Sequence, residues 1–507
     1  MKKIFLTAVA AIMFILTAQA QRLSCLRGGA LTRADVSALP VPYDFDSHKT
    51  YRVPVVLISF SDMDFSMDNP SAYYDRLFNE PGFNEGMGLG CVADYFRDQS
   101  AGRANFQFDI YGPLKIDKNA GNRTFRDMYG DYDMKSAIEI LCKTPGLDFS
   151  VYDWESKGTA DIVLFIAAGY SGESNSGYIW PNTSRFIFNT QLPGGINPNF
   201  QSTSCEMWKD NSLCGIGTII HEFCHFLGLP DIYPLQCNIY SAIDEWDLMD
   251  GGNYTNKGWC PPNLTAMELM YLGWASPEEL TGPVAVEGLK PLSNGGKSYI
   301  IRNSTFNNEF YLLENRQQEG WDYGCPGNGL LIYHVNYDQY SWANNMVNYG
   351  TDPFRFDLFH ADGKDFRAWC PRNDGNDLTR WTEDNQLRSS YLSTSPYPFT
   401  DYVTLQTNDS LTDSSSPAAT LINVSDGRKY MGKPITDITM AADGTISFNF
   451  MKDNSTGIMP SAFTDEPETW YSIDGRRFSE PTGKGLYILS PKSGNRQEKS
   501  GQKIILW

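Results

Sequence analysis

The pattern of apolar and polar positions divides the chain into two regions with different predicted architecture. In the first region, continuous apolar runs at residues 53–60 and 161–168 are typical of buried strands, the second of them central in a sheet. Residues 106–111 alternate between apolar and polar side chains, which predicts a half-buried strand. Helical spacing predicts helices near residues 92–98 and 134–142. This mixture of strands and helices indicates an α+β fold.

After Trp274 the pattern changes to short β-like runs separated by glycine, asparagine and proline turns. These runs predict a β-rich, sandwich-like architecture, and they lie at residues 299–302, 310–313, 329–335 and 444–450. Residues 453–457 have the composition of a linker. We therefore expect three successive parts: an α+β domain at residues 46–275, a β-rich domain at 276–450, and a linker with a small C-terminal β-module at 451–507.

The first twenty residues differ from the rest of the chain. Two lysines precede an apolar run at residues 4–17, and Ala18-Gln19-Ala20 forms a small-x-small cleavage site. This order predicts a secretory signal peptide at residues 1–20. The polar, turn-rich residues 21–45 predict a leader or short pro-segment. A membrane anchor is the alternative, but the apolar run is short for a bilayer span and ends in a processing site.

Composition and charge exclude several classes of function. The chain has 507 residues, of which 41% are hydrophobic and 14% aromatic, enough for packed cores. Lys and Arg total 41 against 60 Asp and Glu, a formal net charge of -19. This balance argues against nucleic acid and against anionic membrane surfaces as partners. No later segment is long and apolar enough to span a membrane.

Two of the five histidines lie four residues apart, in the segment His221-Glu222-Phe223-Cys224-His225. On a helix over residues 216–227, the apolar side chains cluster on one side and both histidines project from the opposite side, about 40° apart. Two imidazoles one helical turn apart can bind a single metal ion. Glu222 can reach a metal-bound water and take its proton. The segment therefore predicts a metal-dependent hydrolytic site.

A third metal ligand is expected just after this helix. Gly228 should end the helix, because glycine readily adopts the left-handed conformation of a helix C-terminus. The turn can then bring Asp231 back to the metal, in a string that matches the elongated metzincin motif with aspartate in place of the usual third histidine. Glu245 is the competing ligand. Two histidines, one carboxylate and an open position favour zinc over other metals.

Further residues could support this site or compete with it. Met249 lies in a glycine-rich turn whose distance from the motif resembles the Met-turn beneath a metzincin zinc. Tyr254 could stabilise the tetrahedral oxyanion, with a packed or surface tyrosine as the alternative. Cys224 is expected to be buried or disulfide-linked, and His334, in a β-run, is expected to be structural. Cys25 could cap the zinc as a thiolate in a silent precursor.

Ten cysteines follow the expected signal peptide, and an exported protein can form disulfides. Cys205 lies close to Cys214 in the sequence, and Cys237 to Cys260, so both pairs are candidates that the sequence alone does not decide. The chain contains no Cys-x-x-Cys pair, which argues against a cysteine-based zinc finger.

The metal motif and several flanking strings resemble the immune inhibitor A family of secreted bacterial metallopeptidases. The strings lie at residues 59–62, 95–102, 217–223, 227–233, 245–249, 312–317 and 329–335, so the resemblance spans roughly residues 50–365. It implies a zincin, metzincin-like catalytic domain with His221, His225 and Asp231 as zinc ligands and Glu222 as the general base. It also implies structural calcium, with no ligands that can be placed here. Cys224 departs from the family's usual glycine.

The last residues, 470–477 and 485–488, resemble the C-terminal sorting tails of type IX secretion substrates. The resemblance makes secretion machinery an expected partner. A small β-module used for binding or packing is the alternative.

These observations predict a secreted or cell-surface zinc-dependent endopeptidase, exported through its N-terminal signal peptide. It would hydrolyse peptide bonds of extracellular proteins through a zinc-bound water activated by Glu222. The alternative is a non-catalytic zinc-containing surface binding protein or adhesin with a decayed peptidase domain. The intact Glu222 argues against decay, because a structural zinc needs no base.

Overall fold

The chain separates into two compact units, Met1–Lys452 and Asp453–Trp507. The computed structural model describes residues 39–124, 127–235, 242–349, 353–364, 392–423 and 427–452 of the first unit, and four strands of the second. The expected signal peptide and the leader up to residue 38 lie outside the described residues. Within the described residues, no helix is long and apolar enough to cross a membrane.

The first sheet has five strands in the order β2-β1-β3-β5-β4. Its strands are β1 (Thr50–Phe60), β2 (Asn105–Ile116), β3 (Thr159–Tyr170), β4 (Asn182–Arg185) and β5 (Asn197–Met207). β2, β1, β3 and β5 run parallel, whereas β4 runs antiparallel to β5 at the edge of the sheet. The apolar run at residues 161–168 lies in β3, which has a strand on each side, so the prediction of a central strand is confirmed.

Helices pack on both faces of this sheet. The helices of the first unit are α2 (Pro70–Asn79), α3 (Val92–Gln99), α4 (Asp131–Leu141), α5 (Gly217–Phe226), α6 (Ala266–Tyr271) and α7 (Gln339–Ala343). Short 3-10 helices lie at Glu85–Met87, Ser150–Tyr152, Asp244–Trp246, Gly252–Gly258, Leu292–Asn294 and Gly320–Gly324.

Alternate side chains of β1 enter two different cores. Val53 and Val55 pack in a core with buried side chains of α3 and α5. Val56 and Ile58 pack in the opposite core with buried side chains of α4. Because successive side chains of a strand point to opposite faces, a sheet covered on both faces requires the continuous apolar run at residues 53–60.

The later strands form two further sheets that share one core. One sheet has the order β11-β10-β9-β8-β6 and the other β14-β15-β7. Their strands are β6 (Glu278–Glu279), β7 (Val284–Leu289), β8 (Ser298–Asn303), β9 (Phe306–Arg316), β10 (Gly329–Asn336), β11 (Phe356–Leu358), β14 (Ile435–Met440) and β15 (Ile446–Phe450). A small hairpin joins β12 (Phe399–Thr400) to β13 (Thr407–Asn408).

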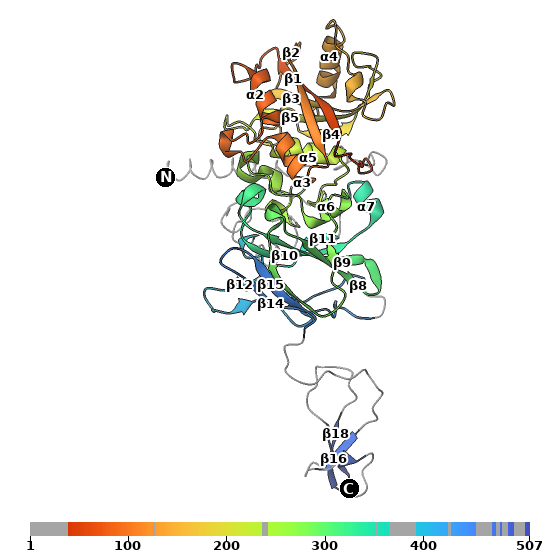
Figure 1. Cartoon of the computed structure of the whole chain (residues 1–507), viewed down its shortest axis with the longest axis vertical. Coiled ribbons are helices and arrows are strands. Elements are labelled where there is room, and N and C mark those ends of the chain that lie inside the picture. Colours follow the sequence, from red (N-terminus) through yellow and green to blue (C-terminus); the bar gives the residue numbers. More distant parts are fainter. Residues whose placement is uncertain are drawn as a thin grey trace. The chain divides into compact units, whose positions relative to one another are not determined.

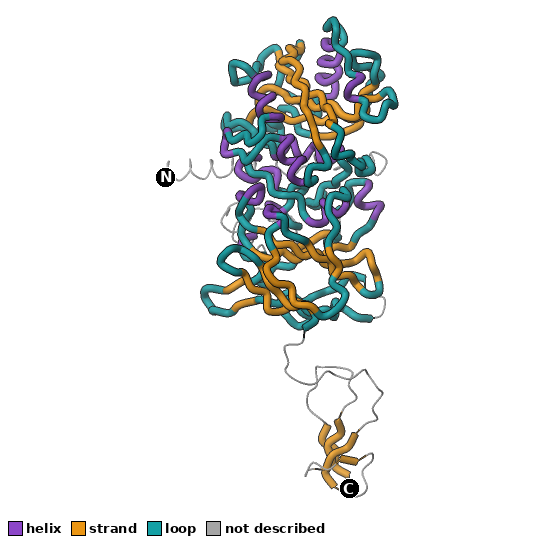
Figure 2. Tube along the Cα trace, in the orientation of Figure 1, coloured by secondary structure: helices purple, strands orange, loops and turns teal. Residues whose placement is uncertain are grey.

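The β10 strand shows how the layers are stacked. Leu330 and Ile332 enter the core between the two later sheets, whereas Leu331 and Tyr333 enter the core that contains α3 and α5. Helices α3, α5, α6 and α7 therefore lie between the first sheet and the later sheets (Figures 1 and 2). The first unit is a mixed α/β structure, consistent with the predicted α+β class. Its later region is not wholly β, because α7 begins at the N-cap Asp338.

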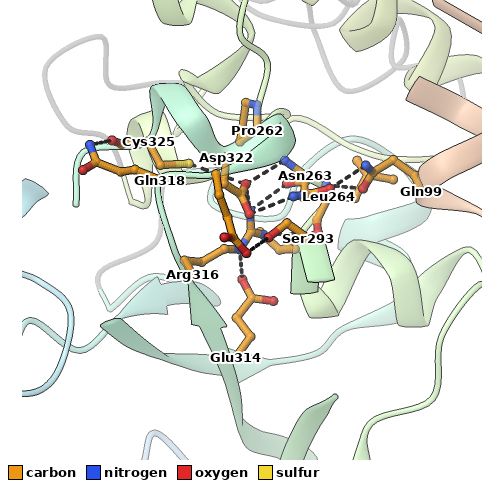
Figure 3. A network of polar contacts seen from close by, with 12 residues as sticks. Gln99, Pro262, Asn263, Leu264, Ser293, Glu314, Arg316, Gln318, Asp322 and Cys325 are labelled. Atoms are coloured by element: carbon orange, nitrogen blue, oxygen red, sulfur yellow. Dashed lines mark hydrogen bonds and ion pairs between the residues drawn. The ribbon is translucent and has the colours of Figure 1, made fainter. Parts of the chain in front are cut away.

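A buried ion cluster ties the later sheet to the helical layer (Figure 3). Arg316 on β9 is fully buried, and its guanidinium lies 2.7 Å from Glu314 Oε1 and 2.6 Å from Asp322 Oδ1. It also donates to the backbone carbonyls of Asn263 and Leu264, at 3.1 and 3.2 Å. The carboxylates have further donors, since the Asn263 side chain donates to Asp322 and the Ala266 backbone N–H donates to Glu314, both at 2.7 Å.

Residues 39–45 pack into the first unit although they belong to the predicted leader. The backbone N–H of Leu39 donates to the carbonyl of Ala343 in α7 at 2.7 Å. Phe45 is buried, and its ring centroid lies 4.9 Å from that of Tyr51 and 5.4 Å from that of Phe106. This part of the expected leader is therefore an integral element of the folded unit.

The second unit contains one described sheet. Its strands are β16 (Thr469–Ser472), β17 (Arg477–Phe478), β18 (Gly485–Ser490) and β19 (Gln502–Leu506), in the antiparallel order β17-β16-β18-β19. The segments that resemble a sorting tail overlap the first three of these strands.

Candidate metal centre

The helix that carries the two histidines ends as its sequence predicts. Gly228 has a φ of +104°, in the left-handed region that favours glycine. Its N–H donates to the carbonyl of His225 at 3.1 Å, and the N–H of Leu229 donates to the carbonyl of Cys224 at 3.0 Å. These two bonds form a Schellman motif, which reverses the chain and turns the residues that follow back toward the helix.

Backbone carbonyls orient both imidazoles. His221 Nδ1 lies 2.9 Å from the carbonyl oxygen of Leu248, and His225 Nδ1 lies 2.8 Å from that of Leu229. A carbonyl can only accept a hydrogen bond, so each Nδ1 carries the proton. In the neutral ring Nε2 then presents a lone pair, which is the form that binds a metal ion.

Asp231 completes a compact cluster with these nitrogens. Its Oδ1 lies 3.3 Å from His221 Nε2 and 3.3 Å from His225 Nε2. One ligand atom from each of the three residues lies within 4.8 Å of the others, and all three residues are buried. Burial alone would raise the pKa of Asp231, but the neighbouring His225 and His221 outweigh it and hold the pKa well below its ordinary value. The carboxylate is therefore available in its charged form.

The residues of this cluster fit a zinc ion. Two imidazole nitrogens and one carboxylate oxygen are a common catalytic zinc donor set, and a zinc ion bound between them could accept a lone pair from each. Glu245, the competing ligand, does not belong to the cluster. Among the described residues, this is the one group of three or more His, Cys, Asp or Glu side chains that could hold a metal, and the calcium prediction stays untested.

Asn345, which the sequence analysis missed, holds Asp231 from the later region of the chain. Its side-chain oxygen accepts the N–H of Asp231 at 2.6 Å, and its Nδ2 donates to Asp231 Oδ2 at 2.7 Å. Asn348 donates from Nδ2 to the carbonyl of the next residue, Ile232, at 2.8 Å. An asparagine in a loop far along the chain carries no sequence signal of such a role.

The predicted Met-turn packs against the metal motif through its backbone. The carbonyl of Leu248 holds His221, and the carbonyl of Met249 accepts the N–H of Ile232 at 2.9 Å. Met249 is fully buried, and its own N–H donates to Asp247 Oδ1 at 2.7 Å. The turn therefore supports both the first histidine and the segment that carries the aspartate.

Glu222 follows His221 on α5 and is anchored to an edge strand of the first sheet. The Thr183 hydroxyl on β4 lies 2.7 Å from the backbone carbonyl of Glu222 and 3.0 Å from its Oε2. Both residues are buried. The carboxylate that the sequence predicts to be a base thus lies against β4, at one edge of the sheet.

The hydroxyl of Tyr254, nominated as an oxyanion stabiliser, donates to Glu173 Oε1 at 2.6 Å. Glu173 also accepts from the Ser171 hydroxyl at 2.9 Å. Burial raises the pKa of Glu173, whereas Tyr254, Ser171 and the charge of His221 oppose that rise. Glu173 was missed because it lies in the glycine- and serine-rich loop that follows β3. Its electrostatic interaction with His221 places it near the metal cluster.

Among the residues that the structure describes, the other histidines and the cysteines do not join the cluster. His334 lies 2.7 Å from Glu309 Oε1, which agrees with the predicted structural role, while His48 is exposed and His360 is buried. Cys224 is a buried free thiol, in agreement with one of its two predicted states. Cys205 and Cys214 are also free, so that candidate disulfide is absent; Cys25 and Cys237 lie outside the described residues.

The comparisons with known proteins agree with a metal-dependent peptidase in outline. No protein-family model matches the chain. Its curated relatives include the pre-pro-metalloprotease PrtV of Vibrio cholerae serotype O1, in strains M66-2 and ATCC 39315 / El Tor Inaba N16961, at 24% identity over 263 residues in each case. The match covers 42% of this chain and only 28% of the relatives' length. The chain is therefore distantly related to a metalloprotease.

Proposed function

We propose that this chain is a secreted zinc-dependent endopeptidase with a metzincin-like catalytic domain of the immune inhibitor A type. The observation that carries the proposal is the buried convergence of His221 Nε2, His225 Nε2 and Asp231 Oδ1, with Glu222 adjacent on the same helix. The distant relationship to a metalloprotease supports the same reaction class.

Zinc, when bound to His221, His225 and Asp231, would polarise the scissile carbonyl and lower the pKa of a coordinated water. Glu222 accepts a proton from the attacking water as the new carbon–oxygen bond forms. It then transfers this proton to the leaving amine nitrogen when the peptide carbon–nitrogen bond breaks. The Thr183 hydroxyl, 2.7 Å from the Glu222 carbonyl and 3.0 Å from its Oε2, helps to orient this carboxylate.

The substrate in this proposal is an extended peptide segment of an extracellular protein. β4 is one of the two edge strands of the first sheet and pairs with β5 within that sheet. An extended peptide can add to such an edge through backbone hydrogen bonds. Because Thr183 on β4 contacts Glu222, a peptide bound along this strand would lie beside the proposed base.

The remaining assignments belong to the same proposal. Residues 46–275 form the catalytic domain and residues 276–450 the β-rich domain, while residues 451–507 comprise the linker and a tail that secretion machinery would recognise. Export through the N-terminal signal peptide would place the enzyme outside the cell or at its surface.

The test is cleavage of a peptide library by the purified mature protein, with and without a zinc chelator. We expect cleavage that chelation abolishes and added zinc restores, with about one zinc per chain by metal analysis. Glu222→Gln should retain the zinc and lower kcat by a factor of about 10²–10⁴, because the proton acceptor is lost.

A protein that binds zinc but cleaves nothing, or whose Glu222→Gln variant cleaves as fast as the parent, would contradict the proposal. Stoichiometric zinc without cleavage is the result that the alternative predicts, namely a non-catalytic zinc-containing surface binding protein or adhesin.

A further inference from the structure

We infer that Asn345 is a positioning residue for the metal centre, which aims one oxygen of Asp231 at the two histidines. The inference rests on the proposed function, because it takes Asp231 as a zinc ligand. It assigns a role at the metal centre to a residue of the β-rich region, outside residues 46–275 that carry the metal motif.

The two hydrogen bonds between these residues define which oxygen faces the metal. The N–H of Asp231 can only donate, so the group 2.6 Å away must be the amide oxygen of Asn345. The amide nitrogen therefore faces Asp231 Oδ2, to which it donates at 2.7 Å. With Oδ2 engaged in this way, Oδ1 is directed at His221 Nε2 and His225 Nε2, at 3.3 Å from each.

A carboxylate without such a bond can rotate about its side-chain torsions and present either oxygen. Asp231 follows a glycine turn and a proline and lies outside α5, so the helix backbone does not set the orientation of its side chain. The amide of Asn345 forms hydrogen bonds with both the backbone and the side chain of Asp231, which removes this rotational freedom. Removing the hydrogen-bond partner of a metal ligand typically weakens metal binding by about 10- to 100-fold.

The segment that carries Asn345 is itself well anchored. We call residues 344–348, which follow α7, the strap. Asn345 has a φ of +54°, a left-handed conformation that asparagine tolerates, and its side chain is buried. Asn348 accepts the N–H of Phe356 at 3.1 Å and donates to its carbonyl at 2.9 Å, which ties the strap to β11. The strap therefore presents Asn345 to Asp231 from a fixed base.

The experiment compares zinc affinity and the thermal stability of the zinc-free full-length chain in three variants. Asn345→Gly removes the amide and keeps the left-handed backbone free of strain. Asn345→Asp keeps the volume and the acceptor for the Asp231 N–H and, measured at a pH where the new carboxyl is ionised, has no donor to Oδ2. Asp338→Ala is the matched control, because it removes the cap of α7, which Ser341 contacts at 2.7 and 2.8 Å, without touching a proposed ligand.

Zinc affinity is measured by competition with a chromophoric chelator. We expect the zinc dissociation constant to rise about 10- to 100-fold in Asn345→Gly and at least about 10-fold in Asn345→Asp. Asp338→Ala should lower the melting temperature of the zinc-free protein but change the dissociation constant by less than about 3-fold. If Asn345→Gly does not fold, the isosteric Asn345→Asp variant decides the question alone.

Parent-like zinc affinity in the folded Asn345 variants would overturn the inference, and so would an equal loss of affinity in Asp338→Ala. A parent protein that binds no zinc would overturn both this inference and the proposed function. If the parent binds zinc, loses affinity in the Asn345 variants and yet cleaves no peptide, only the peptidase activity is refuted and the positioning role stands.

Discussion

The metal centre and the Arg316 cluster are both buried groups of charged or titratable side chains, but their partners differ. In the Arg316 cluster, a guanidinium lies between Glu314 and Asp322, and each carboxylate has further donors (Figure 3). At the metal centre, three atoms that can each bind a metal ion lie together instead: His221 Nε2, His225 Nε2 and Asp231 Oδ1. Burial of charge alone thus does not mark a functional site. A cluster of metal-ligand atoms is the stronger indication, because a bound cation can interact with all of them at once.

The sharpest way to separate the two clusters is to neutralise Asp231. In Asp231→Asn, the donor of Asn345 should attract the new amide oxygen, so the new NH₂ group turns toward the histidines. Zinc affinity should fall by about 10³-fold or more, since a ligand is replaced by a donor. The zinc-free protein should unfold within about 1 kcal/mol of the parent, because the new donor satisfies the imidazole lone pairs.

Competition titration and urea unfolding of the zinc-free protein check this prediction. Glu245→Gln is the matched control, since it removes the competing acid and should leave zinc affinity within about 3-fold. A larger effect in Glu245→Gln than in Asp231→Asn would reverse the choice of third ligand.

Replacing Arg316 should produce the opposite pattern. Arg316→Met leaves Glu314 and Asp322 buried without their counter-charge, which typically costs about 3–5 kcal/mol of folding stability. The fraction that remains folded should bind zinc with parent-like affinity. Urea unfolding curves measure the loss of folding stability. Zinc titration at urea concentrations below the unfolding transition measures the zinc affinity of the folded variant. A stable Arg316→Met variant with weakened zinc binding would contradict the assignment of a structural role to the Arg316 cluster and a metal-binding role to the other.

Glu268 provides a smaller, pH-dependent test on a third buried acid. Its Oε2 accepts the N–H of Thr265 at 2.6 Å. Burial raises the pKa of Glu268 from an ordinary 4.5 to about 7. Glu268 also interacts electrostatically with Asp247, whose pKa is raised as well. The folded state therefore holds a proton that the unfolded chain releases above pH 4.5. This stabilising contribution is complete below pH 4.5 and is lost as the pH rises through about 7.

Between pH 5 and pH 8 the parent should thus lose about 2–3 kcal/mol that Glu268→Gln retains. Denaturant unfolding across this pH range measures the difference. Parallel pH profiles for parent and variant would show that Glu268 does not retain its proton on folding.

The smallest expected effect concerns Tyr254. Because its hydroxyl donates to Glu173, Tyr254→Phe should lower stability by about 1–2 kcal/mol through the loss of a bond to a buried acid. On this geometry kcat should change by less than about 10-fold. A direct oxyanion donor would instead cost about 10²–10³ in kcat. Steady-state kinetics of Tyr254→Phe with a peptide substrate distinguish the two roles.

Hydrophobic patterning located the elements whose faces are apolar. The runs at residues 53–60 and 161–168 became β1 and β3, and the helix expected over residues 216–227 became α5. β5 was missed because its buried segment is polar. There, Gln201 donates to Asp131 Oδ1 at 2.7 Å, so hydrogen bonding replaces the hydrophobic pattern that would have revealed a strand.

Some residues of the candidate site could be predicted from the sequence, and others could not. His221, Glu222 and His225 could be placed together from sequence, because helical spacing fixes their relation. Asp231 required the glycine turn, which is also local. Asn345 and Glu173 could not be found, since their positions depend on how distant segments pack. Local geometry is readable in a sequence, whereas contacts between remote loops are not.

The packing of residues 39–45 limits how far the N-terminus can be trimmed. The carbonyl oxygen of Pro40 lies 2.6 Å from the position a Cβ would take on Gly228, so this segment lines the back of the metal turn. Leu39 binds Ala343, two residues before Asn345. Proteolytic maturation that stops ahead of Leu39 keeps both contacts, while a cut after Pro42 removes them. A recombinant form intended to retain zinc should therefore begin at or before Leu39.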